Sequence, residues 1–173
     1  MKKTLIVVDM QNDFIDGALG TKEAVAIVPK VAEKIRNFTG KVLFTRDTHE
    51  ENYMETREGR YLPVPHCIKD TDGWKLNEKV QKALDAKEYD VIHKPTFGST
   101  KLVEMLKDCN QLDTDVTLIG LCTDICVVSN AMLLKANYPE MNINVEAACC
   151  AGVTIEKHEA ALEVMRSCQI NVL

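Results

Sequence analysis

Short apolar segments alternate with amphipathic ones along almost the whole chain of 173 residues. Residues 4–8 form a β-branched apolar run that stops at Asp9, and residues 22–38 then repeat apolar positions at helical spacing. The same pattern predicts further strands at 41–45, 89–93, 116–120, 142–146 and 170–173, and helices at 77–85, 99–109, 123–136 and 156–167. Such regular alternation favours an α/β fold, in which helices cover both faces of a parallel sheet.

One long segment interrupts this pattern. Residues 47–76 lack clear periodicity and are rich in charge, His, Pro and Gly. A segment of this length inside a compact domain is usually functional or disordered. Because no repeat, linker or low-complexity tract divides the chain, we expect residues 1–173 to form a single domain.

Composition excludes several classes of protein. A formal net charge of −5 argues against a general nucleic-acid binder, which needs clustered Lys and Arg. No apolar run approaches the ~18 residues of a membrane-spanning helix, and residues 5–8 are too short for a signal-peptide core. The seven cysteines include no CxxC pair, which argues against a zinc ribbon or a thioredoxin motif. We therefore expect a cytoplasmic protein with mostly free thiols.

Open α/β sheets bind ligands beyond the carboxyl ends of their strands, so the residues after each strand carry the most information. Cys126 lies where the strand 116–120 gives way to a helix, and Thr123 is a natural cap for that helix. The helix dipole is then expected to lower the pKa of the Cys126 thiol, as a nucleophile requires. A buried, inert thiol is the alternative reading of this residue.

Two charged residues also end strands. Asp9 follows four apolar residues, where a carboxylate costs free energy unless it is paired, and one use for it there is as general base for a thiol. Lys94 directly follows the strand 89–93 and would suit a position between Asp9 and the Cys126 thiol. A turn aspartate and a solvated surface lysine remain the alternatives.

A metal site is the third candidate. Asp47 and His49 are two residues apart on an extended segment, so both side chains project to one side, and His66 could complete a set of two histidines and one carboxylate. Glu58 lies between them as a further candidate ligand. The other two histidines, His93 and His158, are interpreted as structural.

At this point the motifs match a known family. The chain resembles the isochorismatase-like cysteine hydrolases, and among them the nicotinamidases (pyrazinamidases). The resemblance covers nearly the whole chain and rests on residues 8–14 (VDMQNDF), 46–49 (RDTH), 66–67 (HC), 94, 97–99 (FGS), 120–127 (GLCTDICV), 148–154 (ACCAGVT) and 158–162 (HEAAL). The first of these segments combined with TDICV is the specific part of the match.

The resemblance implies a fold and a catalytic centre. The fold would be a Rossmann-like α/β/α sandwich of three layers, with a mainly parallel sheet of six strands. The catalytic triad would be Asp9, Lys94 and Cys126. A cis peptide bond would join Leu121 to Cys122, and the backbone N–H groups of Cys122 and Cys126 would form an oxyanion hole.

The resemblance also implies a cofactor and a substrate. Asp47, His49 and His66 would hold a divalent metal, with zinc expected and manganese or iron as alternatives. The substrate would be a small amide, nicotinamide, whose pyridine nitrogen meets the metal while Phe14 packs on its ring. Hydrolysis through a Cys126 thioester would give nicotinate for NAD salvage. We expect copies of the chain to assemble into a homo-oligomer, with neither nucleic acid nor membrane as a partner.

The sequence departs from the nicotinamidase pattern in one place. Many nicotinamidases carry Trp-Pro before the residue that precedes the second metal histidine, whereas residues 62–66 here read LPVPH and the only tryptophan is Trp74. Two alternatives therefore stay open. One is a related amidase that acts on a carbamoyl or ureido amide without metal, and the other is a non-catalytic redox thiol protein.

Overall fold

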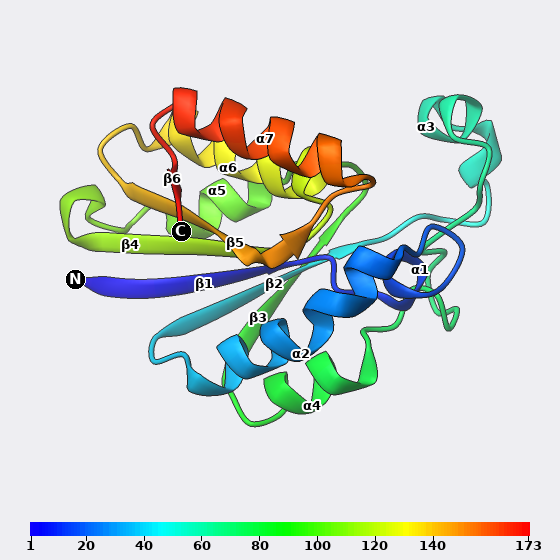
Figure 1. The fold of residues 1–173 in the computed structure, drawn as a ribbon, viewed down its shortest axis with the longest axis horizontal. Helices are drawn as coiled ribbons and strands as arrows, with labels where there is room; N and C mark the ends of the chain where they lie inside the picture. Colours follow the sequence, from blue (N-terminus) through cyan, green and yellow to red (C-terminus); the bar gives the residue numbers. More distant parts are fainter.

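The computed structural model describes all residues, 1–173, and contains one sheet of six strands between two layers of helices (Figure 1). The strands are β1 (Lys2–Val8), β2 (Lys41–Asp47), β3 (Tyr89–Lys94), β4 (Thr114–Leu121), β5 (Asn142–Ala151) and β6 (Asn171–Val172). Their order is β3-β2-β1-β4-β5-β6, and every neighbouring pair is parallel. The expected α/β fold with a six-stranded parallel sheet is confirmed.

Helices cover both faces of this sheet, as Figure 1 shows. α2 and α4 lie on one face, while α5, α6 and α7 lie on the other. The helices are α1 (Asn12–Ile15), α2 (Lys22–Asn37), α3 (Arg57–Tyr61), α4 (Glu78–Leu84), α5 (Thr100–Leu106), α6 (Val128–Asn137) and α7 (Ile155–Ser167). α3 stands apart from both layers, beyond the carboxyl ends of the strands (Figure 1). None of the helices is long and apolar enough to span a membrane.

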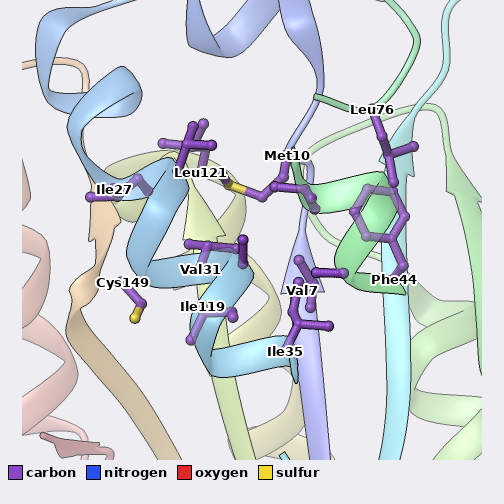
Figure 2. Close-up of a cluster of buried hydrophobic side chains, with 14 of the residues drawn as sticks. Val7, Met10, Ile27, Val31, Ile35, Phe44, Leu76, Ile119, Leu121 and Cys149 are labelled. Atoms are coloured by element: carbon purple, nitrogen blue, oxygen red, sulfur yellow. The ribbon is translucent and has the colours of Figure 1, made fainter. Parts of the chain in front are cut away.

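The spacing of apolar residues explains how α2 packs. Ile27, Val31 and Ile35 recur every four residues and point at the sheet, toward Val7 and Ile119 (Figure 2). All five side chains are buried in one of the two hydrophobic clusters, which lie on opposite faces of the sheet. Burial of side chains this size contributes roughly 1.5–3 kcal/mol each, so the amphipathic face fixes the helix on the strands.

The strand order places a crevice at the centre of the sheet. From β1 the chain moves outward through β2 and β3, and it then returns to the other side of β1 to form β4. Crossovers that leave in opposite directions separate the loops beyond β1 and β4, and ligands bind at such a switch point in open α/β sheets. The carboxyl ends of β1 and β4 therefore define where a site is expected.

Three local expectations need correction. The helix expected at 123–136 begins as a single π turn, Thr123–Val127, and becomes α-helical only from Val128. β5 was expected at 142–146 but runs on to Ala151, because a register shift against β4 lets pairing resume at Cys150. The aperiodic segment 47–76 contains a 3₁₀ turn, Tyr53–Glu55, followed by α3.

Candidate active site

Four strand ends bring the predicted catalytic and metal-binding residues together. Asp9 directly follows β1, Lys94 is the last residue of β3, and Cys126 lies in the π turn that follows β4. Asp47 is the last residue of β2, with His49 two positions later. All five side chains are buried.

Lys94 lies between the two other members of the expected triad. Its ammonium contacts Asp9 Oδ2 at 2.6 Å and Cys126 Sγ at 3.4 Å. It also donates to the carbonyl of Thr96 at 3.1 Å and lies 3.2 Å from Asp47 Oδ1. Burial alone would lower the pKa of Lys94, but the carboxylates of Asp9 and Asp47 outweigh it and hold the pKa well above its ordinary value. Lys94 is therefore a permanent cation within a buried site.

Asp9 is held from two directions. Its backbone N–H donates to the carbonyl of Thr45 at 3.1 Å, and the Thr45 hydroxyl donates to Asp9 Oδ1 at 2.7 Å. The backbone at Asp9 has a φ of 46°, which turns the chain sharply at the end of β1. Burial raises the pKa of Asp9, although Lys94 offsets part of this effect. A carboxylate with a raised pKa accepts a proton more readily, as a general base must.

The electrostatics of Cys126 differ from the sequence expectation. Burial, followed by the charge of Asp9, raises the pKa of the Cys126 thiol well above its ordinary value, and Lys94 opposes this only in part. We expected the helix dipole to lower this pKa, and that expectation was wrong because the thiol is fully enclosed beside a carboxylate. Cys126 is therefore a neutral thiol until a neighbouring group takes its proton.

The turn that carries Cys126 is fixed by its neighbours. The expected cis peptide bond between Leu121 and Cys122 is confirmed. Thr123 is not the helix cap, since Cys122 occupies that position without a side-chain hydrogen bond. The Thr123 hydroxyl instead lies 2.7 Å from Nδ1 of His158 on α7. This contact ties α7 to the turn that carries Cys126.

A second cluster of side chains adjoins the triad. Asp47, His49 and His66 each offer one ligand atom, and these atoms lie within 4.8 Å of one another. Asp47 Oδ2 is 3.1 Å from Nε2 of His49 and 3.6 Å from Nε2 of His66. In a tetrahedral site with zinc–ligand bonds of ~2.1 Å, two ligand atoms lie about 3.4 Å apart. The spacing of the cluster therefore suits a divalent metal.

Hydrogen bonding supports the same conclusion. His66 uses Nδ1 for the carbonyl of Val64, at 2.8 Å, which leaves Nε2 aimed at the cluster. Nε2 of His49 is buried without any hydrogen-bond partner. Metal-bound histidines usually direct the second ring nitrogen to a carbonyl or carboxylate, as His66 does. A buried imidazole nitrogen without a hydrogen-bond partner, 3.1 Å from a carboxylate oxygen, suits a divalent cation bound between the two.

Comparison with known proteins agrees with this geometry. Residues 3–173 match the model of the isochorismatase domain family. The chain belongs to the isochorismatase family. It is 35% identical over 150 residues to an uncharacterized isochorismatase family protein, PncA, of Bacillus subtilis, covering 76% of this chain and 78% of that one. It is 25% identical to the nicotinamidase/pyrazinamidase of Mycobacterium tuberculosis, covering 99% and 98%.

A solved structure extends the likeness to three dimensions. The pyrazinamidase of Pyrococcus horikoshii, determined in complex with zinc, superposes on this isochorismatase family member with a TM-score of 0.80. The match covers 100% of this chain and 99% of the other at 30% identity. The whole chain, including the segment from β2 to α4, therefore follows one family architecture.

The segment 47–76 supplies a further ligand candidate and one wall of a cavity. Glu58, on α3, places Oε1 3.7 Å from Nε2 of both His49 and His66. Glu58 also lines a cavity of about 570 Å³ beside the site. The remaining lining residues are Arg57, Tyr61, Leu62, Thr96, Phe97 and Ile125. Ile125 directly precedes Cys126 and Thr96 binds Lys94, so this cavity leads to both clusters.

Aromatic residues divide between the site and a separate stack. Phe14 is buried beside the candidate metal cluster, with its ring centroid 5.5 Å from that of His66. Trp74 does not line the cavity. Its ring stacks on His93 at 5.8 Å and lies under the guanidinium of Arg46 at 4.2 Å. The apolar lining of the cavity comes from Tyr61, Leu62, Phe97 and Ile125.

Two buried amide side chains at the site were missed in the sequence. Gln11 and Asn130 are both fully buried, and each hydrogen-bonds to residues of two different segments. Gln11 follows a strand, and Asn130 interrupts the apolar run 125–134. In both cases a polar residue stands where an apolar one would be expected, and this was the signal available in the sequence.

Proposed function

We propose that this chain is a cysteine amidohydrolase that converts nicotinamide to nicotinate and ammonia. The observation that carries the proposal is the contact of one buried ammonium, Lys94, with both a carboxylate, Asp9, and a thiol, Cys126. The adjoining metal-compatible cluster is the second support. The nicotinamidase/pyrazinamidase of M. tuberculosis and the pyrazinamidase of P. horikoshii, which resemble the chain over almost its full length, bear names that agree with this activity.

The first half of the reaction forms a thioester. Asp9 takes the proton of Cys126, and the positive charge of Lys94 stabilises the resulting thiolate. The thiolate attacks the carboxamide carbon, and the backbone N–H groups of Cys122 and Cys126 stabilise the oxyanion. Asp9 then returns its proton to the amine, so that ammonia leaves and the nicotinoyl group remains on Cys126.

The second half releases the product. Asp9, now a carboxylate again, takes one proton from the water that attacks the thioester and passes it to the departing sulfur, which regenerates the Cys126 thiol. The second water proton passes to solvent, and the product leaves as nicotinate. Throughout both steps the ring packs on Phe14, which lies beside His66. The released nicotinate would serve NAD salvage.

The metal cluster would orient the substrate. Asp47, His49 and His66 would hold the divalent ion, with Glu58 as a fourth neighbour. When bound, the ion supplies a Lewis-acid site for the pyridine nitrogen. Zinc suits two imidazoles and a carboxylate at these spacings, and manganese or iron are the alternatives.

Three wider expectations accompany the proposal. Residues 1–173 act as one domain, the protein works in the cytoplasm, and copies of the chain form a homo-oligomer. All three stay predictions from the sequence.

The test is a comparison of substrates. Purified protein loaded with zinc is given nicotinamide and, separately, an N-carbamoyl amino acid, and both ammonia and the organic product are measured. Release of ammonia with an equal amount of nicotinate supports the proposal. Turnover of the carbamoyl substrate alone would instead favour a related amidase. No release from either substrate would favour a thiol protein without this chemistry.

A further inference from the structure

The site is assembled from segments that follow four different strands, so contacts between these segments must hold them in place relative to one another. Backbone pairing ends with the strands, and beyond that edge only side chains link one loop to the next. Gln11 and Asn130 are the two fully buried carboxamides at this edge. Neither has a chemical step in the reaction proposed above, on which the following inference rests.

Gln11 connects the β1 loop to a metal ligand. Its Nε2 donates to the carbonyl of Asp47 at 2.8 Å, and its Oε1 accepts the N–H of Asp47 at 2.7 Å. The same Nε2 donates to the carbonyl of Trp74 at 3.1 Å. The amide thus occupies both backbone groups of Asp47 at once. Because Gln11 lies two residues after Asp9, this contact links the Asp9 loop to Asp47.

Asn130 connects the nucleophile turn to the Lys94 loop. Its Nδ2 donates to the carbonyl of Cys126 at 2.8 Å and to that of Phe97 at 3.1 Å. Its Oδ1 accepts the N–H of Ser99 at 3.0 Å. The Phe97–Ser99 segment begins three residues after Lys94 and follows Thr96, whose carbonyl accepts from the Lys94 ammonium. Asn130 therefore joins the two loops that must bring the ammonium and the thiol together.

We propose that Gln11 and Asn130 are positioning residues with separate tasks: Gln11 sets Asp47 for metal binding, and Asn130 sets Cys126 against Lys94. In both cases the partners determine which way the amide is turned, because its NH₂ faces carbonyl oxygens and its oxygen faces an N–H. Removing either amide leaves buried backbone groups without partners, and the loops must shift to satisfy them. Metal ligands and reacting atoms tolerate only small displacements.

The test uses three alanine variants with matched chemistry. Gln11→Ala and Asn130→Ala remove the two amides, and Asn144→Ala is the control. Asn144 is also buried and donates to a main-chain carbonyl, that of Val116, but it lies near the start of β5, away from the strand ends that form the site. Two readouts need no substrate: the affinity of metal-free protein for zinc, by competition with a chromogenic chelator, and the rate at which iodoacetamide alkylates Cys126 in the zinc-loaded protein, by peptide mass spectrometry.

The two amides should affect different readouts. We expect Gln11→Ala to weaken zinc binding about 10- to 100-fold, which is the usual effect of losing a group that orients a ligand. In the zinc-loaded variant, the rate of Cys126 alkylation should stay within about threefold of the wild-type rate. We expect Asn130→Ala to slow the alkylation about tenfold and to lower kcat for nicotinamide by about 100-fold with little change in KM, while zinc affinity stays within about threefold. Asn144→Ala should change neither readout.

Unchanged zinc affinity in Gln11→Ala, unchanged alkylation in Asn130→Ala, or either effect in Asn144→Ala would overturn the inference. If an alanine variant does not fold, Gln11→Met and Asn130→Asp, which keep the side-chain size, replace it with the same expected results. Wild-type protein that binds zinc but leaves nicotinamide intact would contradict the proposed function alone, since neither substrate-free readout depends on it.

Discussion

Lys94 is the residue on which the electrostatics of the site depend. Its ammonium compensates Asp9 and Asp47, and none of these side chains is more than slightly accessible to solvent. Buried charges are tolerated only when they are paired, and removing one partner of a buried pair typically costs about 3–5 kcal/mol. The same ammonium also contacts Cys126. Stability and chemistry therefore depend on one side chain.

We predict that Lys94→Met abolishes turnover and lowers the free energy of unfolding by about 3–5 kcal/mol near pH 8. The loss should shrink as the pH falls. Burial already raises the pKa of Asp9, and without Lys94 it rises further, so acid protonates Asp9 and removes the uncompensated charge. Urea denaturation of both proteins near pH 8 and near pH 5 measures the difference. An equal loss at both pH values would contradict this account.

The thiol itself gives a second prediction at this scale. Because burial and Asp9 raise the pKa of Cys126, little thiolate exists in the resting site at neutral pH. The rate at which iodoacetamide alkylates Cys126 should therefore still increase with pH at about pH 9. Peptide mass spectrometry separates this rate from those of the other six cysteines. A rate that reaches its plateau below about pH 8 would show a resting thiolate and contradict the prediction.

Single residues also show how far the sequence can be interpreted. Residue type and position at the strand ends marked Asp9, Lys94, Cys126 and the Asp47–His49–His66 set only as candidates, and the family motifs then assigned their roles. The direction of the Cys126 pKa shift was not accessible in that way. It depends on complete burial beside Asp9, which only the packed structure shows.

Among the elements, the junction between β4 and α6 determines where Cys126 lies. Gly120 has a φ of 116°, a backbone conformation that residues with a side chain rarely adopt. A Cβ at this position would lie 2.1 Å from the carbonyl oxygen of Val8. β1 and β4 therefore approach each other closely just before the chain turns into the Cys126 loop. A glycine is required at this position both for its backbone and for its lack of a side chain.

We predict that Gly120→Ala lowers the free energy of unfolding by more than about 2 kcal/mol, because strain at φ and the clash with β1 act together. Gly98→Ala is the matched control. Its Cβ would meet no atom closer than 3.6 Å, and Gly98 has no positive φ, so its stability should stay within about 1 kcal/mol of wild type. Chemical denaturation of both variants measures the contrast, and equal stability of the two variants would argue against it.

Element boundaries were predicted less well than element types. Each expected helix and strand exists, yet β5 extends five residues further and the helix after β4 starts with a π turn. Both differences arise from tertiary contacts. A register shift against β4 prolongs β5, and the Thr123 hydroxyl binds His158 on α7 instead of capping its own helix. Glu58 was only loosely placed, since periodicity did not predict α3.

At the scale of the whole molecule, the metal cluster joins parts of the chain that are far apart in sequence. Asp47 ends β2 and His49 lies two residues later, whereas His66 comes after α3 and Glu58 lies on α3 itself. An ion held by all of them would connect the projecting α3 segment to the sheet. Metal binding should therefore stabilise the folded protein as well as serve the reaction.

We predict that zinc raises the melting temperature of metal-free protein. Free zinc at 100 times its Kd stabilises the fold by about 2.7 kcal/mol, which corresponds to roughly 5–10 °C for a chain of this size. His66→Ala should remove this increase, whereas His93→Ala, which changes a histidine outside the cluster, should keep it. Thermal scans with and without zinc measure the shift. An equal shift in His66→Ala would place the ion elsewhere.

Ammonia release from nicotinamide shows whether the Cys126 thiol attacks the amide. Zinc-loaded wild type, Cys126→Ala and Cys149→Ala are compared; Cys149 is a buried cysteine in the hydrophobic cluster under α2. We predict turnover by wild type, turnover within about threefold of it by Cys149→Ala, and no ammonia above the uncatalysed rate from Cys126→Ala. Ammonia release by Cys126→Ala at the wild-type rate would contradict the thioester mechanism.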